Sequence, residues 1–333
     1  MPATLQAHLE TIDETARAIQ EGESLFLAGS RQVLERLPRG NWIGGTIAYF
    51  MTETGGLMTE DRIFVTPAPA FALRSRVATY GADEIENIYA DAPESGFTFV
   101  VMPAGTAVLT RFAEQAPACD GFLIRPVVGW VAGVRVDRLR CETPAVFNGL
   151  TGEAMEDRCC ALHVALPAGR IADLAIVNIF EPGDGEVIHF DRTGFEVQDC
   201  EIGGRRVNLA GYVASHALKT EFPLVGDYAG TNINVSFQKV DAKTGVVDFY
   251  APVFPGVDYR FARPITDYAE AFRSKIGATE REPAFACNCI LNYLYAKLEG
   301  KTTGSITGPI TFGEIAHQLL NQTMVQLTIC DVD

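Results

Sequence analysis

The chain has 333 residues, of which 47% are hydrophobic, enough to bury one large core or two ordinary ones. Its 42 acidic and 27 basic side chains give a formal net charge of -15. This charge repels nucleic-acid backbones and anionic lipid surfaces, so we expect neither nucleic acid nor a membrane as a partner.

The chain also lacks the sequence marks of export. Residues 1–14 carry acidic side chains and a helical pattern, and do not resemble a secretory signal. The apolar runs at 122–134 and 173–180 are interrupted well before the ~18 residues that a membrane span needs. The 8 scattered cysteines are typical of reduced thiols. We therefore expect a cytoplasmic protein without disulfides.

The predicted elements begin with a helix. Residues 3–20 carry apolar side chains at helical spacing, which predicts a helix that packs by one face. Residues 24–29 and 42–50 then predict two strands with a short helix between them. Gly44 and Gly45, inside the second strand, indicate a bend or a close approach by another group.

The pattern of predicted strands and helices then changes once, near Cys159. Strand-like and helical patterns alternate over residues 63–131, as in strand–helix–strand units. From about Cys159, closely spaced strands with polar or glycine turns favour antiparallel hairpins. Two helices at 265–277 and 290–298 precede a final strand. The expected class is α/β (mixed α+β), with two intimately packed halves that meet near residue 225 and contain mixed and antiparallel sheets flanked by helices.

Two cysteines stand at a predicted junction of a strand and a helix. A thiol at the N-terminus of a helix has a lowered pKa, so Cys287 and Cys289 suit nucleophilic or redox chemistry. One hypothesis is therefore a cysteine-dependent enzyme of acyl transfer or hydrolysis, with Cys289 or Cys287 as nucleophile and Glu314 or a histidine as base. The alternative is that both thiols are buried as small hydrophobic side chains.

Motifs for metals and common cofactors are absent. The 5 histidines show no metal-ligand spacing, and the cysteines lack the paired spacing of structural zinc sites. The glycine patterns of dinucleotide and triphosphate sites do not occur. We expect no metal and no cofactor, with His163 as the one histidine whose apolar surroundings would suit haem.

Polar residues gather near the C-terminus. The carboxylate of Glu314 and the primary amide of Asn321 flank glycine turns. Pockets for small polar ligands use such groups, because glycine lets a ligand approach backbone N–H groups. The alternative is that Glu314 caps a short helix and Asn321 closes a turn.

Three segments, at 285–289, 308–315 and 320–327, resemble the closing part of FIST C-terminal sensory domains. Those domains show a phenylalanine–cysteine strand, a glycine–aromatic–glycine–glutamate–isoleucine stretch and an asparagine-x-threonine strand. The sequence departs from them at Ile290 and Leu291, where a glycine–arginine pair tends to follow.

The N-terminal part resembles the same family at one turn. Gly44–Ile47 stands where FIST N-terminal domains have a turn rich in glycine, serine and threonine. The resemblance divides the chain into a FIST-N-like domain at 1–225 and a FIST-C-like domain at 226–333.

The resemblance implies a stand-alone intracellular sensor that acts in signal transduction. Its ligand would be a small polar metabolite such as an amino acid, and a signalling protein would be its partner. Some family members bind haem, and a homodimer is left open. The expected ligand site lies between the two halves and is lined by Trp42, Thr46, Tyr49, Cys287, Asn288, Cys289, Glu314 and Asn321.

Overall fold

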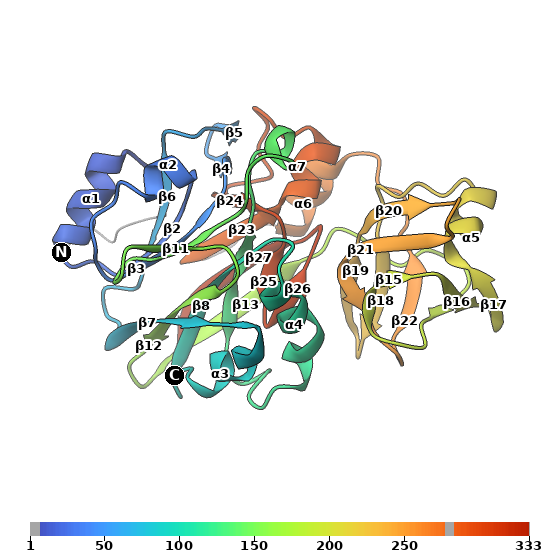
Figure 1. Ribbon diagram of the computed structural model, residues 1–333, viewed down its shortest axis with the longest axis horizontal. Helices are drawn as coiled ribbons and strands as arrows, with labels where there is room; N and C mark the ends of the chain where they lie inside the picture. The colour runs from blue at the N-terminus through green and yellow to red at the C-terminus, as the bar shows by residue number, and fades with distance from the viewer. Residues whose placement is uncertain (1–6, 277–282, 333) are drawn as a thin grey trace.

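The computed structural model describes residues 7–276 and 283–332, and Figure 1 shows its ribbon. Within those residues the chain is 42% strand and 19% helix, arranged as five mixed or antiparallel sheets with seven α-helices. The predicted mixed α+β class is therefore confirmed.

The first sheet forms the N-terminal edge of the molecule. The helix predicted over 3–20 begins at Ile12 instead, and residues 3–6 lie outside the described part. Thr11 and Glu14 form a capping box that fixes this start. Only β2 and β3 are parallel in this sheet. In spatial order its strands are β1 (His8–Glu10), β6 (Ile63–Pro67), β2 (Leu25–Gly29), β3 (Trp42–Thr46), β10 (Val146–Asn148) and β11 (Glu153–Met155), with α1 (Ile12–Gln20) and α2 (Arg31–Leu34) beside it.

The second sheet combines strands from the middle and the end of the chain. Its parallel pair is β8 with β9, and β25 adds to β9. The helices α3 (Ile85–Ala90) and α4 (Ala107–Gln115) connect its strands. In order they are β26 (Gln318–Leu320), β25 (Glu314–Ala316), β9 (Val127–Ala132), β8 (Gly96–Pro103), β12 (Cys159–Ala165) and β7 (Arg74–Tyr80).

The third sheet also joins distant segments. The strand predicted at 42–50 is interrupted at Ile47 and Ala48, after which β4 enters this sheet and pairs with β24. The helix α7 (Ile290–Ala296) directly follows β23. In order the strands are β13 (Arg170–Val177), β27 (Met324–Asp331), β23 (Phe285–Cys289), β24 (Gly308–Thr311), β4 (Tyr49–Thr52) and β5 (Gly55–Met58).

Aromatic side chains from all three sheets meet in one core. The rings of Phe26 and Phe99 stack with centroids 4.7 Å apart, and Phe285 lies 5.4 Å from each of them. Trp130 packs against Phe26 at 5.8 Å. Because such contacts add to the gain from burying apolar surface, this cluster ties the ends of the chain together.

The segment between β13 and α6 (Tyr268–Ile276) builds a separate β unit, at the right of Figure 1. It has its own apolar core, which includes Phe190, Phe249 and Tyr259. The predicted division at residue 225 stays a prediction, and Val225 lies inside a strand of this unit. Its elements are β14 (Ile188–His189), β15 (Gly194–Val197), β16 (Asp199–Ile202), β17 (Arg205–Asn208), α5 (Leu209–Ser215), β18 (Leu224–Tyr228), β19 (Thr231–Val235), β20 (Phe237–Asp241), β21 (Val246–Val253) and β22 (Asp258–Phe261).

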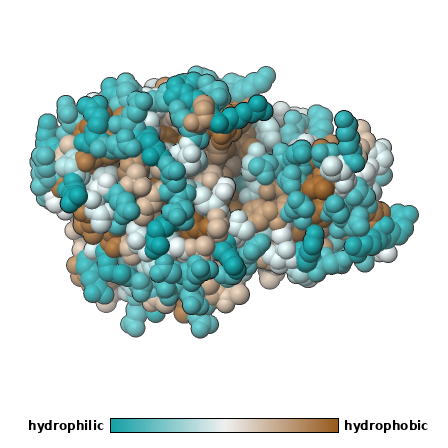
Figure 2. All heavy atoms as spheres, viewed as in Figure 1, coloured by the Kyte–Doolittle hydropathy of each residue, from teal (hydrophilic) through white to brown (hydrophobic). Residues whose placement is uncertain are grey.

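Hydrophilic residues cover much of the face shown in Figure 2, in keeping with the formal charge of -15. Among residues 7–276 and 283–332, no helix has the length and apolar character needed to cross a membrane.

Candidate ligand-binding site

A pocket of about 320 Å³ opens where three strands end. Ser30 follows β2, Ile47 follows β3, and Gly133 follows β9, so the pocket stands at the carboxyl ends of these strands. β2 and β3 belong to the first sheet and β9 to the second, so the pocket is lined by residues that follow strands of two sheets. The pocket is lined by Ser30, Arg31, Gln32, Thr46, Ile47, Ala48, Glu60, Gly133, Val134, Arg135, Arg138, Cys141, Glu142, Thr143 and Glu156.

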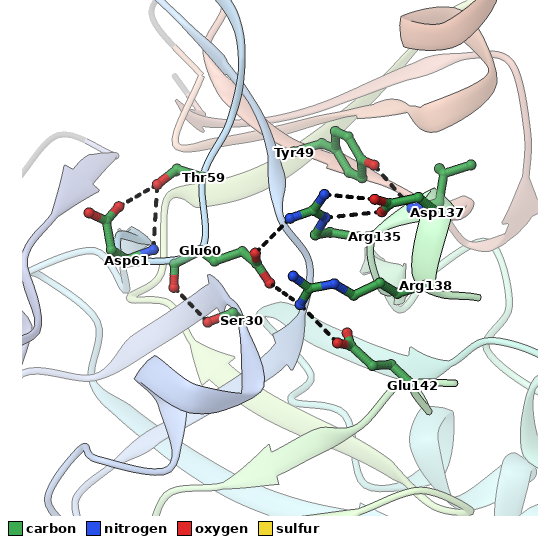
Figure 3. Close-up of polar contacts among 10 residues, drawn as sticks. Ser30, Tyr49, Thr59, Glu60, Asp61, Arg135, Asp137, Arg138 and Glu142 are labelled. Carbon is green, nitrogen blue, oxygen red and sulfur yellow. Dashed lines mark hydrogen bonds and ion pairs between the residues drawn. The ribbon is translucent and has the colours of Figure 1, made fainter. Parts of the chain in front are cut away.

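A carboxylate bridges two arginines in this pocket, as Figure 3 shows. The two oxygens of Glu60 accept hydrogen bonds from Nη1 of Arg135 and Nη1 of Arg138, both at 2.9 Å. Arg135 also donates to Asp137 through Nε and Nη2, at 3.0 and 2.7 Å. These bonds raise the pKa of Arg135 and lower the pKa of Asp137, so both groups stay charged.

Arg138 has donors to spare. Only its Nη1 is used in the described part of the chain, for Glu60 and for Glu142 at 2.9 Å. Its Nε and Nη2 form an open guanidinium edge. The backbone nitrogens of Ala48 and Val134, two residues that line the pocket, also have no hydrogen-bond partner among the described residues. These N–H groups are further candidate donors to an acceptor that enters the pocket.

The pocket also offers acceptors. One oxygen of Glu142 accepts from Arg138, and one oxygen of Glu156 accepts from Arg31. The second carboxylate oxygen of each has no partner within residues 7–276 and 283–332. The side chains that line the pocket therefore carry both free donors and free acceptors.

The predicted N-terminal site residues have different surroundings. Thr46 lines the pocket, and its hydroxyl accepts a hydrogen bond from the Ala145 nitrogen at 2.9 Å. The Tyr49 hydroxyl accepts from the Val136 nitrogen at 3.0 Å, beside the pocket (Figure 3). Trp42 is buried elsewhere and donates to the Pro38 carbonyl at 2.9 Å.

The close approach expected at the double glycine involves a side chain of the protein itself. A Cβ on Gly45 would stand 2.4 Å from Cγ2 of Val101 and 2.8 Å from Cη2 of Trp130. Gly45 therefore leaves room for the packing of Trp130 in the core.

The predicted C-terminal site residues lie together in a second, buried group. Cys287, Asn288 and Cys289 belong to β23, Glu314 begins β25, and Asn321 follows β26. All five are at most 3% exposed. Glu314 accepts two hydrogen bonds from Thr323, and Asn321 accepts one from Ser236. The hydrogen-bond partners of Glu314 and Asn321 thus differ from those of Thr46 and Tyr49. None of the five predicted C-terminal site residues lines the 320 Å³ pocket.

The buried thiols lack the surroundings of nucleophiles. Burial is the main cause that raises the pKa of Cys287 and of Cys289 well above the ordinary value, and nearby Glu314 raises both further. A nucleophilic thiol needs the opposite, a lowered pKa with access to solvent. Of the eight cysteines only Cys141 is exposed, while Cys119 and Cys330 are half-buried.

We therefore expect Cys141 to react first when the native protein meets a disulfide reagent such as Ellman's reagent. The Cys141→Ser variant should lose the fastest phase, and Cys287 and Cys289 should react only after unfolding. A fast phase that survives in Cys141→Ser and disappears in Cys289→Ser would instead support the hypothesis of a thiol enzyme.

The histidine considered for haem has both ring nitrogens engaged. Nε2 of His163 lies 2.8 Å from the Tyr80 hydroxyl, and Nδ1 lies 2.8 Å from the Thr98 hydroxyl. Burial lowers the pKa of His163 to about 4, so the ring is neutral. In the described part of the chain, no three His, Cys, Asp or Glu side chains are grouped to hold a metal ion.

Arg135 and Arg138 were not predicted as site residues, because their partner Glu60 comes from a distant segment. Glu60 follows β5, whereas Arg135 and Arg138 follow β9. The one available signal was the position of Gly133, Val134 and Arg135 directly after a predicted strand, where ligand-binding loops start.

Comparison with known proteins corrects the predicted family. No curated protein and no solved structure matches the chain significantly. The resemblance to FIST domains is wrong, because a different family profile accounts for residues 10–330, both halves included. The three C-terminal segments that suggested FIST, at 285–289, 308–315 and 320–327, are short. The chain belongs to DUF6976, a family of unknown function, over residues 10–330.

Proposed function

We propose that the protein is a receptor for a small zwitterionic metabolite, such as an α-amino acid, which binds in the 320 Å³ pocket. The observation that carries this proposal is the open guanidinium edge of Arg138 beside free carboxylate oxygens of the same pocket. The volume falls within the ~300–1,000 Å³ of typical small-molecule sites.

The carboxylate of the ligand would bind Arg138. Nε and Nη2 of a guanidinium donate two parallel hydrogen bonds to a carboxylate, which fixes its orientation as well as its charge. The unpaired backbone nitrogens of Ala48 and Val134 are further donors for the same group. Arg135 would hold Glu60 in place, since its own donors are used by Glu60 and Asp137.

The ammonium group of the ligand would bind the free oxygens of Glu142 and Glu156. The charged side chains that line the pocket are three arginines (Arg31, Arg135 and Arg138) and three glutamates (Glu60, Glu142 and Glu156), and Asp137 is bound to Arg135 beside them. The pocket therefore offers partners of both signs, and a zwitterion can pair with both, whereas an anion or a cation pairs with only one.

Binding is favoured over thiol catalysis by the exposure of the groups involved. The pocket groups reach solvent, with the Arg138 side chain 37% exposed and that of Glu142 42% exposed. Cys287 and Cys289, by contrast, are each 1% exposed.

A thermal-shift screen with matched compounds tests the proposal. We expect at least one α-amino acid to raise the melting temperature, its des-amino carboxylic acid to raise it less, and its decarboxylated amine to leave it unchanged. A ligand at a hundred times its Kd adds ~2.7 kcal/mol of stability, which is large enough to rank compounds. A screen in which no carboxylate-bearing compound shifts the melting temperature would contradict the proposal.

A further inference from the structure

Each arginine that lines the 320 Å³ pocket is paired with two carboxylates. Arg31 pairs with Glu156 and also lies 3.7 Å from a carboxylate oxygen of Glu35. The other two lining arginines share Glu60, and each binds one further carboxylate, at 2.7 and 2.9 Å (Figure 3). Three guanidinium groups thus face five carboxylates, so negative charge exceeds positive charge by two among these ion pairs.

Two of the five carboxylates carry this surplus into the pocket. Both oxygens of Glu60 and both oxygens of Asp137 accept hydrogen bonds from arginines. Glu142 and Glu156 line the pocket, and each gives only one oxygen to an arginine of the described chain. The second oxygens of Glu142 and Glu156 are therefore the acceptors that suit cationic groups of a ligand.

These two glutamates occupy different places relative to Arg138. Glu142 accepts from Nη1 of Arg138 at 2.9 Å, beside the guanidinium edge that would hold the ligand carboxylate. Glu156 pairs instead with Arg31, whose Nη2 also lies 3.5 Å from the Thr143 carbonyl. The α-ammonium of an amino acid is next to its carboxylate, so Glu142 suits this group. Glu156 is left for a second cation farther along the ligand.

We propose that the ligand of this pocket is a basic α-amino acid, with its carboxylate on Arg138, its α-ammonium on Glu142 and its side-chain cation on Glu156. This inference rests on the proposed function, because it concerns the same pocket and names the class of amino acid. Side chains such as those of lysine and arginine are charged at neutral pH. A basic amino acid therefore reduces the negative surplus, a neutral one leaves it unchanged, and an acidic one increases it.

Partial exposure limits the expected preference for a basic ligand. The side chain of Glu156 is 50% exposed and that of Glu142 is 42% exposed. Ion pairs in contact with water contribute less to binding than buried ones, and salt screens them. We therefore expect a preference of at least about threefold in Kd, not exclusive binding.

Titration calorimetry with two matched pairs of compounds tests the inference. L-Arginine is compared with L-citrulline, and L-lysine with L-norleucine, because the members of each pair differ mainly in side-chain charge. We expect the basic member of at least one pair to bind at least about threefold more tightly than its neutral partner at low salt. The ratio of the two Kd values should shrink as the salt concentration rises from ~0.01 to ~1 M, which shortens the Debye length from ~30 to ~3 Å.

Two variants assign the preference to one side chain. Glu156→Gln removes the charge and keeps the shape, so it should bring the ratio of the two Kd values close to one. The Kd of the neutral partner should stay close to that of the wild type. Glu153→Gln changes an exposed glutamate of β11 that does not line the pocket, and should keep the wild-type ratio.

The failure of this inference is distinguishable from that of the proposed function. Equal affinity within both pairs, with binding lost in Arg138→Gln, would overturn the inference and leave the proposed function standing. A preference that survives in Glu156→Gln would overturn it as well, because the side-chain cation would then bind elsewhere. Binding of none of the four compounds would also overturn it, and the proposed function would then depend on the wider screen. The wild-type ratios and their salt dependence decide the matter even if Glu156→Gln fails to fold.

Discussion

The free energy of unfolding of the wild-type protein is expected to fall between pH 6.5 and 8, and the Glu314→Gln variant is expected to lose most of this fall. Glu314 is fully buried, and burial raises the pKa of its carboxyl group from 4.5 to about 8. Over the interval between these two values the folded state holds a proton that the unfolded state has released. Stability therefore decreases as pH rises, by roughly tenfold in the folding equilibrium constant per pH unit.

His163 acts in the opposite direction at lower pH. Its pKa is lowered from 6.5 to about 4 by burial, so the unfolded state binds more protons than the folded state between these values. The stability that neutral His163 contributes is complete above pH 6.5 and is lost as pH falls. Below pH 6.5 the contribution of His163 to the pH dependence of stability opposes that of Glu314. Above pH 6.5 His163 no longer contributes to the pH dependence, so the fall caused by Glu314 can be measured there.

Chemical denaturation at several pH values checks this prediction. The difference between wild type and Glu314→Gln isolates the carboxyl group, since His189, whose pKa is raised by Asp258, contributes equally to both proteins. The exposed Glu94→Gln variant is the matched control and should follow the wild type. Parallel curves for wild type and Glu314→Gln from pH 6.5 to 8 would show that Glu314 is ionised in the folded protein.

Replacing Gly129 by alanine is expected to cost at least about 3 kcal/mol of stability or to prevent folding, as severe overpacking in a core does. Gly129 stands in β9 between β8 and β25. A Cβ there would lie 1.8 Å from the carbonyl oxygen of Val100. Backbone of a neighbouring strand cannot move aside as a side chain can, so the sheet would have to separate.

Gly185→Ala is the matched control for this substitution. Its Cβ would meet nothing within 4 Å, and we expect a change within ~0.5 kcal/mol, as for other surface substitutions. Urea unfolding of the two variants gives the comparison. Equal stabilities would mean that β8 and β9 are not packed as the structure has them.

Local pattern predicted the elements well where one face of the chain is buried. The strand at 24–29 is β2, because its residues are all in the core. The helix at 3–20 was predicted too long. Leu9 satisfies the helical spacing, but it lies in β1 and pairs with Phe64 of β6. The spacing of apolar residues does not distinguish a helix from a strand at Leu9. The capping box at Thr11 decides where the helix α1 begins.

The candidate site was only partly predictable. Residue types drew attention to Glu314 and Asn321, which the structure places in one buried group with Cys289. The pairing of Glu60 with Arg138 joins the segments that follow β5 and β9, which belong to different sheets, and no local pattern encodes such a contact. The FIST resemblance failed for a related reason, since short motifs carry little information about which strands are neighbours.

Isothermal titration calorimetry with the strongest amino acid from the screen tests the central claim, that Arg138 binds the carboxylate of a ligand in the pocket. Arg138→Gln removes the charged bidentate contact and should raise Kd at least about tenfold, because hydrogen bonds to charged groups are worth ~1.5–3 kcal/mol. The control Arg111→Gln changes an exposed arginine that does not line the pocket, and should bind like the wild type. One ligand per chain, with affinity lost only in Arg138→Gln, is the predicted result, and equal affinity in all three proteins would contradict the account.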